Sequence, residues 1–100
     1  GPEFYLWLLH LERQEVLNEI EYDIIDELYF VTPYTILKEE TDFSDEQLRE
    51  NLVNLIKKGW VRVYSSVDEE SELSKVNMQT NFRSYFYLAS KKGLFEHNMR

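Results

Sequence analysis

Few side chains in this sequence are suited to metal, nucleophilic or acid–base chemistry. The chain has two histidines, His10 and His97, and no cysteine. His10 lies in an apolar segment and His97 lies near the C-terminal end, and neither has a second metal ligand at a typical spacing. We interpret both histidines as structural or incidental residues. The sequence therefore predicts no metal site.

Acidic side chains are abundant, but their spacing is that of helix surfaces. Two carboxylates that catalyse a reaction together need a buried pocket that moves their pKa values apart. Outside the first two residues the only glycines are Gly59 and Gly93, which excludes a glycine-rich phosphate loop. We therefore expect no catalytic residue, no bound cofactor and no enzymatic activity.

Composition favours one small domain. The chain has 100 residues, of which 43% are hydrophobic and 15% aromatic, enough for a single core. The longest apolar run, residues 4–9, is too short to cross a bilayer, and the lack of cysteine is compatible with the cytoplasm, where we expect the protein. Residues 1–4 have the composition of a tag or cloning remnant, and the chain is expected to be a fragment of a longer protein.

Charge is distributed unevenly along the chain, whose net charge is -8. Residues 1–56 contain 14 acidic and three basic residues, whereas residues 57–100 contain five acidic and eight basic residues. The overall acidity argues against non-specific binding to polyanions. The basic C-terminal half nevertheless leaves room for a local basic face.

Residues 11–30 have the periodicity of one long helix. Leu17, Ile20, Ile24 and Leu28 recur at helical spacing and predict a buried stripe. The opposite side carries a ridge of acidic residues, namely Glu12, Glu15, Glu19, Asp23 and Asp26. This ridge is either a solvated face or a docking surface for a basic protein partner.

Two further helices are expected. Thr32 is expected to cap a short helix that has Pro33 in its first turn and ends near Glu40. Ser44 then caps a longer helix, with Gln47 at the capping-box position. The longer helix should bury Leu48, Leu52, Leu55 and Ile56 and end at Gly59.

Two strands and a last short helix follow. Residues 60–65 alternate as a strand, with Val61 and Val63 on one face and Trp60, Arg62 and Tyr64 on the other. A second strand is predicted over residues 84–89, and residues 90–95 begin a short helical segment. The 18 residues between the strands, 66–83, are long for a hairpin connection and are expected to form a mobile loop.

The order of a short helix, a turn, a longer helix and two strands resembles the winged helix-turn-helix superfamily, as found in bacterial transcription regulators. The resemblance covers about residues 14–96 and is carried by Leu52, Leu55, Gly59, Trp60 and Val61, together with residues 87–93. It implies an α+β fold with about three main helices, a two-stranded wing and a short C-terminal helix. We treat residues 5–100 as this one domain, with an apolar extension at 5–11 and a wing loop at 66–83.

The resemblance implies binding to double-stranded DNA and a role in regulating transcription. The longer helix would enter the major groove and the wing would contact the backbone. Asparagine, glutamine and arginine can read bases, whereas cations hold phosphates. The candidate DNA-binding residues are Gln47, Arg49, Asn51, Asn54, Arg62, Lys75 and Arg83. Because acidic residues surround the start of the longer helix, the wing is expected to supply most of the attraction.

The alternative is a protein-interaction module within a larger protein or complex. Its candidate surfaces are the acidic ridge and the apolar N-terminal segment, which contains Tyr5 and Trp7. That segment would serve as core or as the interface of a homodimer. A protein partner and double-stranded DNA thus remain the two kinds of partner that the sequence favours.

Overall fold

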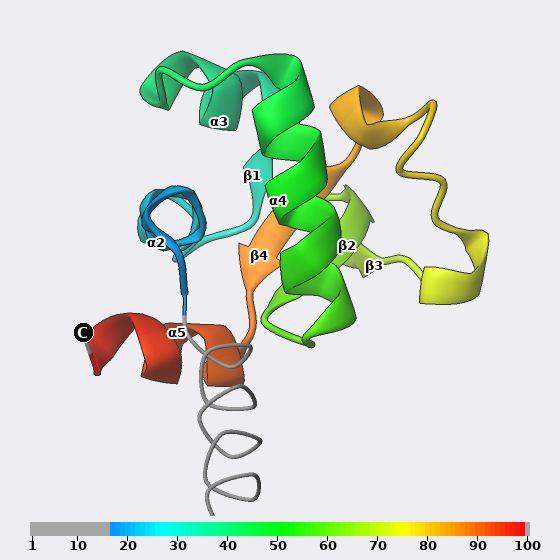
Figure 1. Cartoon of the computed structure of the whole chain (residues 1–100). Coiled ribbons are helices and arrows are strands. Elements are labelled where there is room, and N and C mark those ends of the chain that lie inside the picture. The colour runs from blue at the N-terminus through cyan, green and yellow to red at the C-terminus, as the bar shows by residue number, and fades with distance from the viewer. Residues whose placement is uncertain (1–16, 100) are drawn as a thin grey trace, which may run out of the picture.

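The computed structural model of the chain describes residues 17–99, which form an α+β fold with helices packed against an antiparallel sheet (Figure 1). In chain order the elements are α2 (Glu19–Asp26), β1 (Thr32–Pro33), α3 (Tyr34–Glu40), α4 (Asp45–Lys57), β2 (Val61–Ser66), β3 (Glu69–Glu70), the 3-10 helices η1 (Leu73–Lys75) and η2 (Phe82–Ser84), β4 (Phe86–Ala89) and α5 (Lys91–Asn98). The α+β class expected from the sequence is confirmed.

The sheet contains more strands than the predicted two-stranded wing. Its strand order is β1-β4-β2-β3, and all neighbouring pairs are antiparallel. The long pairing joins β2 to β4, from Val61 opposite Ala89 to Tyr64 opposite Phe86. The prediction of two strands is wrong because β1 and β3 are two residues long each, too short to show the alternation that marks a strand in a sequence.

The first helix is shorter than predicted within the described residues. Helix α2 begins after Asn18, whose side chain forms a capping box with Glu21, and it ends at Asp26 rather than near residue 30. The chain then turns toward the sheet, where the Leu28 carbonyl accepts a hydrogen bond from the Ala89 N–H. Residues 11–16 lie outside the described part. Leu17, Ile24 and Leu28 are buried as predicted, while Ile20 is half-buried.

The expected cap of the second helix is also wrong. Thr32 and Pro33 pair with β4, and the Thr32 hydroxyl donates to the Phe30 carbonyl at 2.7 Å instead of capping a helix. Helix α3 therefore begins at Tyr34, whose N–H donates to the Tyr85 carbonyl. Its end at Glu40 agrees with the sequence prediction.

Helix α4 has the predicted boundaries. Ser44 and Gln47 form the capping box, and the helix stops at Gly59, which has a φ of 77°. The Trp60 N–H donates to the Leu55 carbonyl and the Gly59 N–H to the Ile56 carbonyl, the pair of hydrogen bonds that defines a Schellman motif. Leu48, Leu52 and Leu55 are fully buried, whereas Ile56 is only half-buried.

Helix α5 packs against Trp60, the residue directly before β2. The Ser90 N–H donates to the Trp60 carbonyl, and Ser90 also caps α5. Gly93 allows the close approach, because a Cβ atom there would lie 2.2 Å from the Trp60 carbonyl oxygen. Trp60 is consequently fully buried, while Arg62 in β2 is exposed. No helix within residues 17–99 is long and apolar enough to span a membrane.

Residues 66–83 are more structured than a simple loop. They contain β3, η1 and η2, and the Tyr87 hydroxyl donates to the Phe82 carbonyl at 2.6 Å. The Tyr85 hydroxyl accepts a hydrogen bond from the Asn77 N–H at 2.9 Å. The two tyrosines of the last strand region thus hold this segment against the sheet.

Candidate functional site

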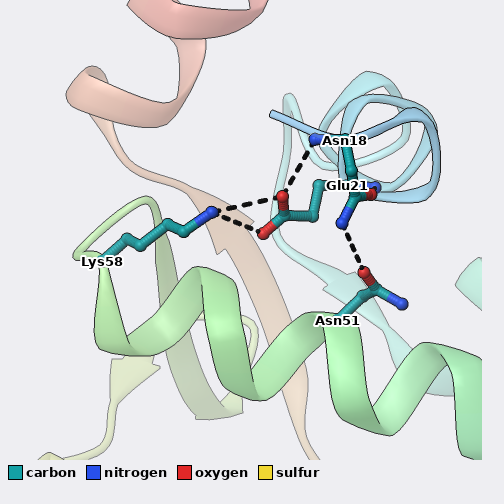
Figure 2. Close-up of polar contacts among 4 residues, drawn as sticks. All are labelled: Asn18, Glu21, Asn51 and Lys58. Atoms are coloured by element: carbon teal, nitrogen blue, oxygen red, sulfur yellow. Dashed lines mark hydrogen bonds and ion pairs between the residues drawn. The ribbon is translucent and has the colours of Figure 1, made fainter. Parts of the chain in front are cut away.

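A cluster of four polar residues joins α2 to α4 (Figure 2). The Lys58 ammonium lies 3.2 Å from Oε1 and 3.0 Å from Oε2 of Glu21, whose side chain is 2% exposed. Oε1 of Glu21 also accepts the Asn18 N–H. The Asn18 side-chain amide donates to Asn51 Oδ1 at 3.2 Å, and Asn51 donates to the Gln47 carbonyl. Since its members satisfy one another, this cluster serves as an interhelical lock.

Asn51 is therefore not available on the outer face of α4. It is 9% exposed and its side chain accepts a hydrogen bond from Asn18, whereas Gln47 and Asn54, the other amides predicted to read bases, are exposed. Glu21 was also missed as a buried residue. The pattern of Asn18 followed three residues later by Glu21 is a capping box, and this signal could have identified its inward position.

The outer face of α4 combines polar and acidic residues. Gln47, Glu50, Asn54 and Lys57 are exposed, and they follow one another at helical spacing. Arg49, the other predicted base-reading residue, donates to Gln79 Oε1 at 3.0 Å. This face thus presents one acid and one base, with Glu46 adding a second exposed acid at the start of the helix.

Both arginines predicted to hold phosphates are paired with acids. The Arg62 guanidinium forms a two-pronged ion pair with Glu70, with Nε 2.8 Å from Oε2, and this bond lowers the pKa of Glu70. Arg83 contacts Asp45 at 3.3 Å. The pKa of Asp45 is lowered, first by the hydrogen bond from the Tyr34 hydroxyl at 2.5 Å and then by Arg83. Lys75, the remaining wing candidate, is exposed.

An acidic hollow lies between α2 and the turn after α3. Its volume is about 240 Å³, and it is lined by five carboxylates together with Thr41 and Phe43: Asp23, Asp26, Glu27, Glu40 and Asp42. The pKa of Glu27 is raised by burial first, then by the charges of Glu40 and Asp26. The carboxylates of Glu27, Glu40 and Asp26 are therefore close enough for their negative charges to repel one another.

The hollow contains part of the predicted acidic ridge. It includes Asp23 and Asp26, whereas Glu19 is exposed outside its lining, and Glu12, Glu15, Tyr5 and Trp7 lie outside the described residues. Sequence reasoning missed Glu27 as a member, and it placed Glu40 at the end of the short helix and Asp42 near the start of the longer one. Only the fold brings the end of α3 back against α2.

His97 lies next to Asp26, one of the residues that line the hollow. It is 7% exposed, its ring stacks on Tyr22 with centroids 4.2 Å apart, and Nδ1 lies 3.0 Å from the Tyr29 hydroxyl. Nε2 lies 3.3 Å from Asp26 Oδ1, without the alignment of a hydrogen bond. His97 thus joins α5 to α2. His10 lies outside the described residues.

Within residues 17–99, no group of three or more histidine or acidic side chains is arranged to hold a metal ion. The chain matches no model of a protein family, and searches of the curated proteins and of the solved structures return no significant match.

Proposed function

We propose that this domain is a non-catalytic protein-interaction module that binds a basic segment of a partner in the acidic hollow. The observation that carries the proposal is the convergence of five carboxylates on one concave surface. A partner's lysine or arginine would relieve their mutual repulsion, and such charge complementarity favours fast and selective association.

The environment of Glu27 supports this assignment. Its pKa is raised first by burial and then by the charges of Glu40 and Asp26, so its ionised form costs free energy in the unbound domain. A bound cation would reverse the sign of that interaction. The hollow is concave, and the lysine and arginine residues that the structure describes do not line it.

Two exposed aromatic residues come shortly after Glu27, a residue that lines the hollow. Tyr29 is 43% exposed and Phe30 is 82% exposed. Aromatic side chains are enriched at the energetically dominant positions of protein interfaces. Arginine and lysine also bind favourably over aromatic rings. Both features suit a partner segment that carries basic residues.

We further propose that the domain is a member of the winged helix-turn-helix superfamily and that it works in the cytoplasm. The order of α2, β1, α3, α4, β2 and β4 supports the first part, with β3 and residues 71–85 extending the wing. The cysteine-free sequence is compatible with the second part. Fold alone assigns no partner.

DNA binding and transcription regulation form the rival proposal, and the side-chain pairing favours it less. Phosphate contacts need free cations, whereas Arg62 and Arg83 are paired with Glu70 and Asp45. The wing also carries exposed acids at Asp68, Glu69 and Glu72. DNA would have to displace these internal partners and approach an acidic tip.

A fluorescence anisotropy titration separates the two proposals. The probes are a labelled nona-arginine peptide and a labelled DNA duplex, each at two salt concentrations. The hollow variant replaces three exposed acids, Asp23→Asn, Glu40→Gln and Asp42→Asn, and the matched control makes the same charge change at the wing with Asp68→Asn, Glu69→Gln and Glu72→Gln.

We expect the hollow variant to bind the peptide about tenfold more weakly than the control does, because it removes the converging charges. Equal weakening in both variants would mean that net charge alone attracts the peptide and would overturn the proposal. Tight duplex binding that weakens steeply with salt would favour DNA instead.

A further inference from the structure

A second hollow lies on another side of the molecule, between α4 and residues 73–79. Its volume is about 630 Å³, and its apolar lining consists of Val53 and Ile56 from α4 together with Leu73, Val76 and Met78. Leu73 is 57% exposed. In Figure 1 this yellow segment lies on the side of α4 away from α2. We call this hollow the wing groove.

The outer wall of the wing groove is held in place. The Asn77 N–H donates to the Tyr85 hydroxyl, and the Asn77 side chain accepts the Gln79 N–H at 3.0 Å. At one end Arg49 reaches across from α4 to Gln79 at 3.0 Å. A groove whose walls are already ordered needs less ordering when a ligand binds.

The charged residues of the wing groove are basic. Lys57 and Lys75 line it, and neither forms an ion pair with a described residue. Two cations that are free to pair with acids thus lie beside an apolar hollow, in a chain whose net charge is -8. It suits an occupant that combines apolar and acidic residues.

We infer that the wing groove binds the N-terminal segment of a second copy of this chain. Residues 5–9 read Tyr-Leu-Trp-Leu-Leu, and Glu12 and Glu15 follow them. Arg13 stands between the two acids, and residues 5–16 carry two acids against this one base. The segment thus combines apolar residues with a net negative charge, which the groove complements. The aromatic and leucine side chains would lie on the apolar lining, and the two acids would face the lysines.

The position of Leu17 favours a second copy over the same copy. Leu17 is buried, and the neighbouring Asn18 bonds to Asn51 on the α2 side of α4. Val53 lies two positions after Asn51, which is about 200° around a helix. Glu15 comes only two residues before Leu17, so their Cα atoms are at most about 7 Å apart. In the same copy this acid would therefore stay on the α2 side of α4, whereas a second copy has no such constraint. Reciprocal exchange of the segments gives a two-fold symmetric dimer.

The oligomeric state of the full chain tests this inference, measured by size-exclusion chromatography with light scattering over a range of concentrations. The wild-type chain is expected to dimerise. Leu73→Asp places a charge in the groove and should raise the dimer Kd at least about tenfold. Val67→Asp is the control, because Val67 is 66% exposed and does not line the groove.

Charge exchange tests the register of the segment. Lys57→Glu with Lys75→Glu should weaken the dimer, and Glu12→Lys with Glu15→Lys on the same chain should restore it. The absence of native cysteine permits one further check. A Ser74→Cys copy and a differently tagged Leu8→Cys copy should form a mixed disulfide under mild oxidation.

A chain that stays monomeric at all concentrations would overturn the inference. So would a dimer that Leu73→Asp and Val67→Asp weaken equally, or one in which reversing the two acids restores nothing. These outcomes leave the acidic hollow untouched, since its binding is measured with a separate probe and separate variants.

Discussion

Lys58, at the end of α4, contacts both carboxylate oxygens of Glu21, a residue of α2 that is almost fully buried. The same lysine lies 4.8 Å from the ring centroid of Trp60. One cation therefore links the first helix, the end of the longer helix and the aromatic residue on which α5 packs. This contact is one of those that hold α2 against α4, together with the hydrogen bond from Asn18 to Asn51.

Removing the buried carboxylate should destabilise the domain. Glu21→Ala deletes the ion pair and half of the α2 capping box. We expect the free energy of unfolding to fall by about 2 kcal/mol. This is less than the roughly 3–5 kcal/mol of a fully buried pair, because the Lys58 side chain is 27% exposed. Urea unfolding measures the difference. Lys91→Met is the control, since Lys91 is exposed and forms no ion pair with a described residue. A loss below about 0.5 kcal/mol for Glu21→Ala would contradict the lock.

The two glycines of the described fold should respond differently to alanine. Gly93→Ala forces a methyl group against the Trp60 carbonyl, and we expect α5 to shift at a cost of about 1–3 kcal/mol. Gly59→Ala meets nothing within 4 Å but must adopt a φ of 77°, at a cost of about 1–2 kcal/mol. Only Gly93→Ala should shift the fluorescence emission maximum of Trp60. Both variants also carry Trp7→Phe, so that Trp60 is the one tryptophan that emits. Equal spectra would contradict the close packing of α5.

Neutralising Glu27 should stabilise the domain. Because the folded-state pKa of Glu27 is raised, its charge opposes folding at neutral pH, and the opposition disappears as the pH falls through that raised value. Glu27→Gln is therefore expected to raise the Tm at pH 7 and to have little effect near pH 4. Thermal unfolding followed by circular dichroism at both pH values measures this. A lower Tm at pH 7 would show that Glu27 is not repelled by its neighbours.

Asp45 should have the opposite pH dependence. Its folded-state pKa is lowered by Tyr34 and Arg83, so its contribution to stability is present above the unfolded value, about 4, and is lost as the pH falls further. Asp45→Asn should thus lower the Tm at pH 7 and flatten the Tm profile below pH 4. Tyr34→Phe should reproduce part of this change, since its hydroxyl is the largest cause of the shift. If the Tm of Asp45→Asn falls below pH 4 as steeply as that of the wild-type chain, the acid destabilisation comes from other carboxylates and the prediction fails.

Local signals in the sequence predicted the parts of the fold that depend on neighbouring residues. The Ser44–Gln47 capping box, the stop at Gly59 and the Ser90 start of α5 each follow from a few adjacent residues, and all are present. The two longer strands, β2 and β4, were predicted because their residue pattern is also a local signal. Asn18 and Glu21 carried an equally local signal, but the apolar period of residues 11–30 masked it.

Features set by contacts between distant segments were not predicted. Thr32 has the chemistry of a helix cap, yet pairing with β4 places it in a strand. Trp60 was predicted to share a strand face with Arg62, yet Trp60 is buried and Arg62 is exposed, because Gly93 lets α5 approach the Trp60 carbonyl. The acidic hollow likewise joins residues of α2 to Glu40 and Asp42, which are distant in sequence. Periodicity describes one element at a time and contains no information on these contacts.

The most direct test of the proposed interaction is an amide chemical-shift map of the isotopically labelled full chain titrated with the nona-arginine peptide. The account predicts that the largest shifts occur at residues 23–27 and 40–43, with saturation, and that the Asp23→Asn, Glu40→Gln, Asp42→Asn chain loses them. Shifts centred instead on the exposed acids of residues 68–72, or spread evenly over all acidic surfaces, would contradict the acidic hollow as the binding site.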